Sequence, residues 1–230
     1  MVTELVFVNG ERLTNRNWDT TLEKFYITIS RGQKFLILMI TSDIQIYLAS
    51  SSPRRKKLLQ QLNIPFNTIK VDIDEKVRKN EPPVKAVKRL SLEKMEMAKK
   101  VIENGIIITA DTIVVFNGSI IGKPVDEKDA ERILKKLSGR VHKVYTGFCV
   151  LNTINGKIIT DYEKTFVKFR KLNKKEISEY VATGSPLDKA GAYGIQDDFG
   201  AVFVEKINGC YYNVVGLPLP KVYKSILQVV

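Results

Sequence analysis

A continuous apolar run with one acid in its middle constrains the fold of this chain more than any other feature. Residues 106–116 read Ile-Ile-Ile-Thr-Ala-Asp-Thr-Ile-Val-Val-Phe and are rich in β-branched side chains. Such a run is typical of a central strand that is buried on both faces of a sheet. An ionised carboxylate at Asp111 needs a cation, a metal or several N–H donors as compensation. Asp111 is therefore the strongest candidate for a functional residue, and the alternative is a carboxylate that only caps a neighbouring loop.

A short strand followed by a basic helix is the second candidate. Residues 46–48 are hydrophobic, three serines follow soon after, and Pro53 opens a helix whose next four residues are all cations. Proline suits a first helical position, and Ser52 is the natural N-cap. Free N–H groups and the helix dipole favour an anion at such a start, to which Arg54 and Arg55 add positive charge. The alternative is an ordinary Ser-Pro helix start with a solvated basic face.

A lysine on the apolar stripe of a helix is the third candidate. Helical spacing predicts a long amphipathic helix over residues 84–104. Its apolar stripe consists of Val87, Leu90, Met97, Ala98 and Val101. Lys94 falls on the same stripe, where an unpaired ammonium group is costly to bury. The alternative is that its stem follows the apolar surface and its ammonium group reaches water.

The remaining patterns after residue 44 predict further strands and helices. Strands are expected at 67–73, 141–151, 157–172, 201–206 and 211–215, and helices at 53–62, 174–183 and 218–229. Another helix is expected between an Asp126 cap and a stop at Gly139. The one histidine, His142, is expected to be an exposed strand residue rather than a base.

Composition limits the partners of this chain without choosing among them. The 230 residues include 44% hydrophobic and 27% charged side chains, as in an ordinary globular protein with one substantial domain. A net charge of +12 favours polyanions, but the lysines and arginines are spread along the whole chain. Cys149 and Cys210 have neither zinc-site nor disulfide spacing, which indicates a reducing, cytosolic compartment. The apolar run at 35–40 is too short to span a bilayer, and no targeting segment is expected.

Residues 1–43 form a separate segment without recognisable chemistry. The Asn-Gly pair at 9–10 predicts a hairpin turn, and the runs at 25–29 and 35–40 are further candidate strands. The functional domain is expected to begin near Met39. We therefore interpret the first 43 residues as an N-terminal extension of unknown role or as an extended reading frame.

Five blocks of residues resemble, in order and approximate spacing, those of the Maf-like nucleoside triphosphate pyrophosphatases. They are Ala-Ser-Ser-Ser-Pro-Arg-Arg at 49–55, Ala-Asp-Thr at 110–112, Gly-Lys-Pro at 122–124, Lys-Ala-Gly-Ala-Tyr-Gly-Ile-Gln at 189–196 and Val-Gly-Leu-Pro at 215–218. The resemblance covers about residues 44–230. It implies an α/β fold of the type shared with inosine triphosphatases, with a mixed central sheet, flanking helices and two lobes around a cleft. It also implies that the protein is often a homodimer, and the cysteine content above adds the expectation of a cytoplasmic enzyme.

The resemblance also implies an activity and a set of site residues. The family hydrolyses nucleoside triphosphates between the α and β phosphates, and it releases a nucleoside monophosphate and pyrophosphate with the help of a divalent metal. Asp111 matches the proposed catalytic base, and the other matches are Glu75 as an acidic site residue and Ser50, Arg55, Lys94 and Lys123 as holders of the triphosphate. Arg54, Thr112 and Gln196 match the positions that separate the dTTP/UTP branch from the 7-methyl-GTP branch, and here they are similar to the dTTP/UTP branch.

Physical chemistry agrees with this assignment. Lysine, arginine and Mg²⁺ or Mn²⁺ offset the charge that collects on the leaving pyrophosphate. Those metals prefer hard oxygen ligands, so Asp111 and Glu75 are the candidate metal ligands. Asp111 is expected to be a ligand as much as a base, because an ordinary aspartate is only weakly basic at neutral pH. The Gln196 amide offers a donor and an acceptor together, as the edge of a pyrimidine requires.

Two other functions stay open at this point. One is a nucleic-acid or protein-binding regulator of cell division, and the other is a purine triphosphatase that acts on inosine or xanthosine triphosphate. The leading interpretation expects neither a membrane nor nucleic acid as a partner, and it keeps modified pyrimidine triphosphates as further substrates. Asp197, Asp198 and Phe199, which intervene before Gly200, depart from the family pattern and place two extra carboxylates near the expected base site.

Overall fold

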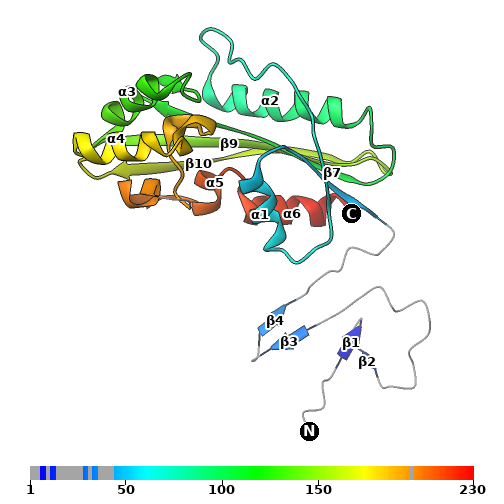
Figure 1. The fold of residues 1–230 in the computed structure, drawn as a ribbon. Helices are drawn as coiled ribbons and strands as arrows, with labels where there is room; N and C mark the ends of the chain where they lie inside the picture. Colours follow the sequence, from blue (N-terminus) through cyan, green and yellow to red (C-terminus); the bar gives the residue numbers. More distant parts are fainter. Residues whose placement is uncertain (1–5, 9–10, 14–27, 31–32, 36–43, 197–198) are drawn as a thin grey trace.

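A mixed sheet of seven strands forms the centre of the molecule (Figure 1). The computed structural model describes residues 6–8, 11–13, 28–30, 33–35, 44–196 and 199–230. The strands of the sheet are β5 (Ile46–Ala49), β6 (Asn67–Ile69), β7 (Ile106–Phe116), β8 (Ser119–Ile121), β9 (Val141–Asn152), β10 (Ile158–Phe169) and β11 (Val204–Asn208). They lie in the order β11-β10-β9-β7-β5-β6, and β8 also pairs with β7. β5 runs parallel to β6 and β7, whereas the other pairs are antiparallel.

Helices cover both faces of this sheet. They are α1 (Pro53–Gln60), α2 (Pro83–Ala98), α3 (Glu127–Leu137), α4 (Lys174–Ala182), α5 (Tyr211–Val215) and α6 (Leu219–Val229), with 3-10 turns η1 (Ser185–Asp188), η2 (Ala190–Ala192) and η3 (Phe199–Phe203). Side chains alternate along β7, so Ile107 packs with Met95 of α2 while Ile108 packs with Leu59 of α1 and Ile226 of α6. The α/β class and the buried central strand predicted from the sequence are both confirmed.

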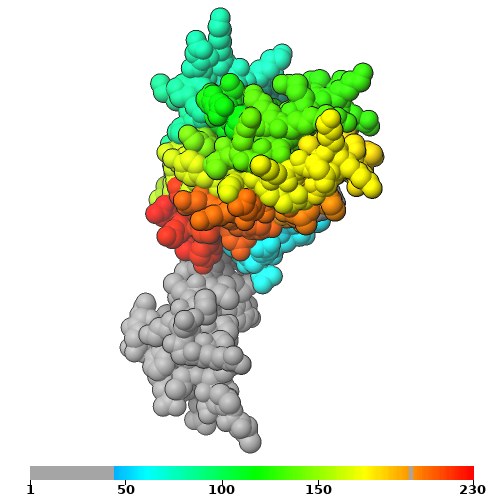
Figure 2. Space-filling model, turned by 90° about the vertical axis from the view of Figure 1, so that its left-hand side faces the viewer, coloured from blue at the N-terminus to red at the C-terminus, as the bar shows by residue number. Residues whose placement is uncertain are grey.

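The second face of the sheet is shared by two groups of helices. α1 and α6 cover one part of it, and α3 and α4 cover another, where Leu134 and Ile177 pack with Val114 and Phe169. In Figure 2 the turquoise residues, which include α2, lie at the top of the coloured part, and the cyan residues of α1 and the red residues of α6 lie at its lower end. Each face therefore has its own apolar core, and β7 contributes side chains to both.

Several predicted elements differ from the observed ones. The helix predicted over 84–104 ends at Ala98, so Val101 lies beyond it and is exposed. Met97 lies inside the helix but is also exposed, and Met95 takes the buried position instead. The chain turns after Ala98 to enter β7, and Gly105 next to that strand has a φ of 147°. The strand predicted over 67–73 contains only Asn67–Ile69, because β5 is four residues long and offers it three partners. Residues 201–203 belong to η3, and the strand predicted from 201 begins at Val204.

The strand predicted at 211–215 is wrong, because this segment forms the short helix α5. Its residues favour strands, but the segment lies between Gly209 and Gly216, whose φ angles are 127° and 122°. The Gly216 N–H donates to Tyr212 O and Asn213 O at 3.1 Å, and the Asn213 side chain donates to Val144 O of β9 at 3.1 Å. These contacts with the sheet override the local preference of the segment.

Two short hairpins precede the sheet in sequence. β1 (Val6–Val8) pairs antiparallel with β2 (Glu11–Leu13), as the Asn-Gly pair predicts, and β3 (Thr28–Ser30) pairs antiparallel with β4 (Gln33–Phe35). The remaining parts of the strands expected at 25–29 and 35–40 lie outside the described residues. In the part of the chain that is described, no helix combines the length and the apolar character needed to cross a membrane.

Candidate active site

A cleft opens where one edge of β7 lacks a neighbouring strand. β9 follows one edge of β7 from Ile106 to Val115. On the other edge β5 pairs with the first three residues of β7, and β8 pairs with 114–116. Within the described ranges, no strand pairs with this edge at 109–113, and Asp111 and Thr112 of this stretch line the cavity. The cavity has a volume of about 610 Å³, which suits a nucleotide-sized ligand.

The cleft can be reached from both faces of the sheet at this gap. Asp111 lies on the α2 face of β7 and Thr112 on the opposite face, yet both line the cavity. The chain leaves β5 at its carboxyl end and begins α1 there, so residues 50–55 line one wall. Ligands of open α/β sheets commonly bind at such carboxyl ends.

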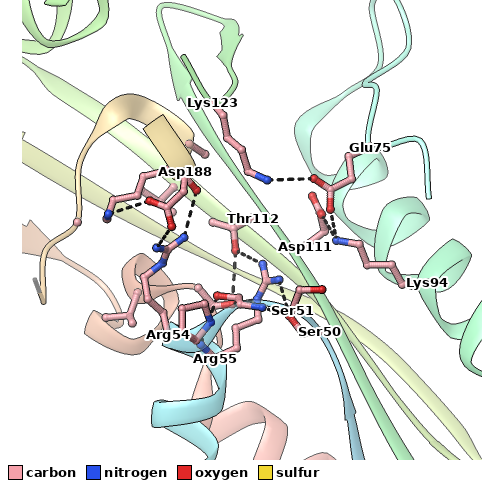
Figure 3. Close-up of a pocket in the computed structure, with 18 of the residues that line it drawn as sticks. Ser50, Ser51, Arg54, Arg55, Glu75, Lys94, Asp111, Thr112, Lys123 and Asp188 are labelled. Atoms are coloured by element: carbon pink, nitrogen blue, oxygen red, sulfur yellow. Dashed lines mark hydrogen bonds and ion pairs between the residues drawn. The ribbon is translucent and has the colours of Figure 1, made fainter. Parts of the chain in front are cut away.

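Lys94 joins the two acidic side chains of the cleft (Figure 3). Its Nζ lies 2.6 Å from Asp111 Oδ1, 2.7 Å from Glu75 Oε1 and 3.4 Å from the carbonyl oxygen of Ala110. The Lys94 side chain is 6% exposed, so its ammonium group does not extend to bulk water. The compensating cation that Asp111 requires is therefore this lysine, two carboxylates share it, and the alternative of a loop-capping carboxylate is not needed.

Glu75 approaches this pair from the loop after β6. Partial burial raises the pKa of its carboxyl group, but the hydrogen bond and charge of Lys94, together with Lys123, outweigh burial and lower the pKa. Lys123 Nζ lies 3.6 Å from Glu75 Oε2 at the exposed mouth of the cleft, after β8. One ammonium group therefore links the two carboxylates, and Lys123 adds a second positive charge next to Glu75.

These two carboxylates fit a magnesium or manganese site that a substrate completes. Among the described residues, no three histidine, cysteine, aspartate or glutamate side chains gather into a metal cage. Mg²⁺ is usually held by one or two carboxylates, water and the phosphates of a substrate. Asp111 and Glu75 supply hard oxygens of that kind, one from β7 and one from the opposite wall of the cleft.

Arg55 is buried in the wall formed by α1. Its guanidinium donates to Gly216 O at 2.8 Å, to Ser50 Oγ at 3.2 Å and to Thr112 Oγ1 at 3.1 Å. All three acceptors are neutral, and burial lowers the pKa of this guanidinium. The three neutral acceptors do not neutralise this guanidinium, and the nearby charges of Asp111 and Glu75 act against burial and raise its pKa. The guanidinium can therefore bind an anion in the cleft.

The start of α1 has the predicted geometry. Ser52 is the N-cap and its hydroxyl accepts from the Arg55 N–H at 3.5 Å, while Pro53 takes the first helical position. Ser50 Oγ accepts from the Ser52 N–H at 3.2 Å. This turn and the Arg55 side chain together build a wall of donors and positive charge.

The structure brings together all nine residues that the sequence predicts for the site. They are Ser50, Arg54, Arg55, Glu75, Lys94, Asp111, Thr112, Lys123 and Gln196. Their individual roles stay predictions. Asp197 and Asp198, the two extra carboxylates, lie outside the described residues.

Asp188 of the cleft was not singled out in the sequence, and Lys189 was given no role beyond its place in the 189–196 block. Asp188, at the end of η1, accepts from Arg54 through Oδ2 at 2.7 Å, and Lys189 Nζ donates to Asp188 Oδ1 at 2.8 Å. Both lie in a loop of small residues and turns, which carries no periodic signal. Gly191 lets this loop approach β7 closely, because a Cβ there would lie 2.9 Å from Val114 Cγ2.

The prediction for His142 is wrong. The side chain is 1% exposed, and its Nε2 lies 2.8 Å from the hydroxyl oxygen of Tyr193, which lines the cleft. Burial lowers the pKa of His142 to about 4. His142 lies on the same face of β9 as the hydrophobic residues Val144 and Phe148, because side chains alternate along a strand. This alternation, given more weight than the polar neighbours of His142, would have indicated burial.

Comparison with known proteins gives a consistent result. A family model described as Maf-like protein matches residues 45–229. A dTTP/UTP pyrophosphatase of Clostridium perfringens is 46% identical over 185 residues, which are 80% of this chain and 96% of that protein. Proteins of the same name from Alkaliphilus metalliredigens and Dictyoglomus thermophilum are 52% and 47% identical, over 77% and 76% of this chain and 92% and 91% of their own lengths.

Proposed function

This chain belongs to the Maf-like protein family, and we propose that it is a nucleoside triphosphate pyrophosphatase that acts on dTTP and UTP. Water would attack the α phosphorus, the bond to the oxygen that bridges the α and β phosphates would break, and a nucleoside monophosphate and pyrophosphate would leave. The observation that carries this proposal is the arrangement of Asp111, Lys94 and Glu75 next to the buried Arg55 in one cleft. The names of the relatives supply the substrate class.

Asp111 and Lys94 are the proposed centre of the chemistry. The Asp111 carboxylate would orient the attacking water and accept its proton, and Lys94 would hold that carboxylate in place at 2.6 Å. Glu75, held by the same lysine, would be the second oxygen ligand of a divalent cation. Bound Mg²⁺ or Mn²⁺ would supply charge stabilisation on the phosphoryl oxygens. The lysine at the centre of two carboxylates gives both of them fixed positions before substrate arrives.

The cationic walls of the cleft are the proposed triphosphate site. Arg55 lies in the wall behind Ser50, and Lys123 stands at the mouth beside Glu75. A guanidinium with a fixed fork is suited to phosphate oxygens, and Lys123 acts as a mobile point charge. Thr112 Oγ1 accepts from Arg55, so we propose that Thr112 affects substrate selection through the position of that guanidinium. Arg54 and Gln196 would contact the base.

Assays of the purified protein with Mg²⁺ or Mn²⁺ test this proposal. Pyrophosphate, not orthophosphate, should appear from dTTP and UTP, and excess chelator or Asp111→Asn should stop its release. Modified pyrimidine triphosphates are further candidate substrates for the same assay. Release of orthophosphate would assign a different bond, and a preference for inosine or xanthosine triphosphate would assign the purine alternative. Salt-sensitive DNA binding that survives Asp111→Ala, without any hydrolysis, would favour a binding protein.

We further propose that residues 44–230 form the catalytic domain, that 1–43 are an N-terminal extension, and that the enzyme is a cytoplasmic homodimer. The family match that begins at residue 45 and the two free cysteines support this organisation and a reducing compartment. A variant that begins at Met39 should keep full pyrophosphate release, and sedimentation should give twice the mass of one chain. Loss of activity on truncation would place part of the site in the extension.

A further inference from the structure

Asp188 connects two cations at the rim of the cleft (Figure 3). Arg54 donates to it twice, from Nη1 to Asp188 Oδ2 at 2.7 Å and from Nη2 to the Asp188 carbonyl oxygen at 3.3 Å. The contact joins the first turn of α1 to η1, which lie 134 residues apart in the sequence. The Arg54 side chain is 19% exposed and that of Asp188 is 59% exposed, so a bound ligand can reach the pair.

Lys189 fixes Asp188 from the other side. Its Nζ donates to Asp188 Oδ1 at 2.8 Å, to Ser185 O at 2.6 Å and to Ser185 Oγ at 3.0 Å, so all three ammonium donors have acceptors within one turn. The Lys189 side chain is 8% exposed, and a Cβ at Gly194 would lie 3.0 Å from its Cε. The loop therefore closes tightly around this lysine, and the carboxylate of Asp188 has one preferred position.

As a result, the neighbouring residues Arg54 and Arg55 of α1 direct their guanidinium groups to different parts of the cleft. In Figure 3 the Arg55 guanidinium lies beside Thr112 and Ser50, toward Asp111, while the Arg54 guanidinium lies under Asp188 on the other side. Partial burial raises the pKa of the Asp188 carboxyl group, but the hydrogen bonds from Lys189 and Arg54 outweigh this effect and lower the pKa. An ionised Asp188 thus neutralises Arg54 and keeps it away from the phosphate-binding wall.

We propose that Asp188 is a positioning residue for substrate selection, which holds Arg54 at the base end of the cleft. This inference rests on the proposed function. Uracil and thymine carry carbonyl oxygens at both C2 and C4, whereas cytosine carries an amino group at C4. A guanidinium only donates hydrogen bonds, so a fixed Arg54 can donate to a carbonyl oxygen at C4 but not to an amino group there. Without Asp188, Arg54 is free to turn toward the triphosphate, which all nucleotides share.

Steady-state rates with UTP and CTP test this role in four proteins. They are the unaltered chain, Asp188→Asn, Arg54→Gln and the double variant. We expect Asp188→Asn to reduce the UTP-over-CTP ratio of kcat/KM about tenfold, mainly through KM, because the change affects binding of the base. The double variant should show the same ratio as Arg54→Gln alone, since Asp188 acts through that arginine. Asp188→Glu, which keeps the charge, should restore part of the ratio.

Glu205→Gln provides a matched control. Glu205 Oε1 accepts from Lys168 Nζ at 2.7 Å, in a pair that also joins two elements, but neither residue lines the cleft. The Glu205 side chain is 47% exposed, against 59% for Asp188. The UTP-over-CTP ratio of Glu205→Gln should equal that of the unaltered chain. Two results would overturn the proposal. One is that Asp188→Asn lowers kcat/KM for UTP and for CTP by the same factor. The other is that Asp188→Asn lowers the UTP-over-CTP ratio further when it is added to Arg54→Gln, and in either case Asp188 only stabilises its loop.

Binding measurements separate this inference from the proposed reaction. A protein that binds UTP but releases no pyrophosphate would refute the reaction, and the ratio of Kd values for UTP and CTP in the same four proteins would still decide the role of Asp188. Equal ratios in the unaltered chain and Asp188→Asn would overturn that role. A protein that binds neither nucleotide would overturn both proposals.

Discussion

Lys94 Nζ lies 2.6 Å from Asp111 Oδ1, and both side chains are buried between α2 and β7. The same ammonium group lies 2.7 Å from Glu75 Oε1, so one cation serves two carboxylates. Removal of one partner from a buried ion pair leaves an uncompensated charge, which is more harmful than removal of both. Stability and catalysis at this site are therefore coupled through Lys94.

Substitutions of this pair should separate the two effects. Lys94→Met leaves two carboxylates together and should lower the free energy of unfolding by about 3 kcal/mol. Asp111→Asn should slow pyrophosphate release by about 10²- to 10⁴-fold, because the charged acceptor for the water is lost. Urea unfolding and a pyrophosphate assay measure both quantities.

The double variant Lys94→Met/Asp111→Asn is the control for this coupling. It should be more stable than Lys94→Met alone, because one of the unpaired carboxylates is gone, while it stays inactive. Strictly additive losses of stability would show that the two residues do not act as a pair.

The sequence predicted Asp111 and Lys94 because each violates the local apolar pattern. A charge in a β-branched run and a lysine on an apolar stripe are visible without any tertiary information. That the two violations compensate each other was not predictable, since it depends on how α2 packs across β7. The cleft itself also depends on topology, because it exists where β5 and β8 leave one edge of β7 uncovered.

The sequence predictions failed where tertiary contacts decide the role or the environment of a residue. Asp188 lies in an irregular loop, and its importance comes from its contact with Arg54, which is 134 residues away in the sequence. Lys189 acts on Asp188 from the same loop. His142 was misassigned because its polar neighbours were weighed above its phase along β9. The segment 211–215 was misassigned because contacts of Asn213 with the sheet override β propensity. Local pattern therefore found the charged residues on β7 and α2, and it failed where contacts distant in sequence decide the environment of a side chain.

Arg55→Met should preserve the fold and abolish binding of the triphosphate. The free energy of unfolding without ligand should stay equal or rise by about 1 kcal/mol, since a buried cation is replaced by an apolar chain of similar length. The hydroxyls of Ser50 and Thr112 would keep other partners, the Ser52 N–H and Thr146 Oγ1. Thermal unfolding with and without UTP tests this, because only the unaltered chain should gain stability from the ligand. A large loss of stability in the ligand-free variant would assign Arg55 a structural role instead.

Gly147→Ala should disturb both the fold and the site. Gly147 pairs with Asp111 across β9 and β7, and a Cβ there would clash with the backbone carbonyl of Val87 in α2. Because backbone cannot move aside like a side chain, the variant should lose about 3 kcal/mol of unfolding free energy. Displacement of α2 should also move Lys94, so activity should fall even where the protein is fully folded.

Gly122→Ala is the matched control for unfolding. Its φ is not in the left-handed region, and an added Cβ would meet nothing within 4 Å. Its unfolding free energy should stay within about 0.5 kcal/mol of the unaltered chain. An equal loss in the two variants would mean that the loss comes from glycine replacement in general rather than from contact with α2.

The His142 imidazole should make stability depend on pH. Burial lowers its pKa from 6.5 to about 4, so the unfolded chain binds a proton more readily than the folded one. The stability that depends on a neutral His142 is therefore fully present above about pH 6.5. This part of the free energy of unfolding, up to about 3 kcal/mol, is lost as the pH falls toward 4. His142→Gln, whose amide oxygen can still accept from the Tyr193 hydroxyl, should flatten that part of the profile. Urea unfolding of both proteins at several pH values measures the difference, and parallel profiles would contradict it.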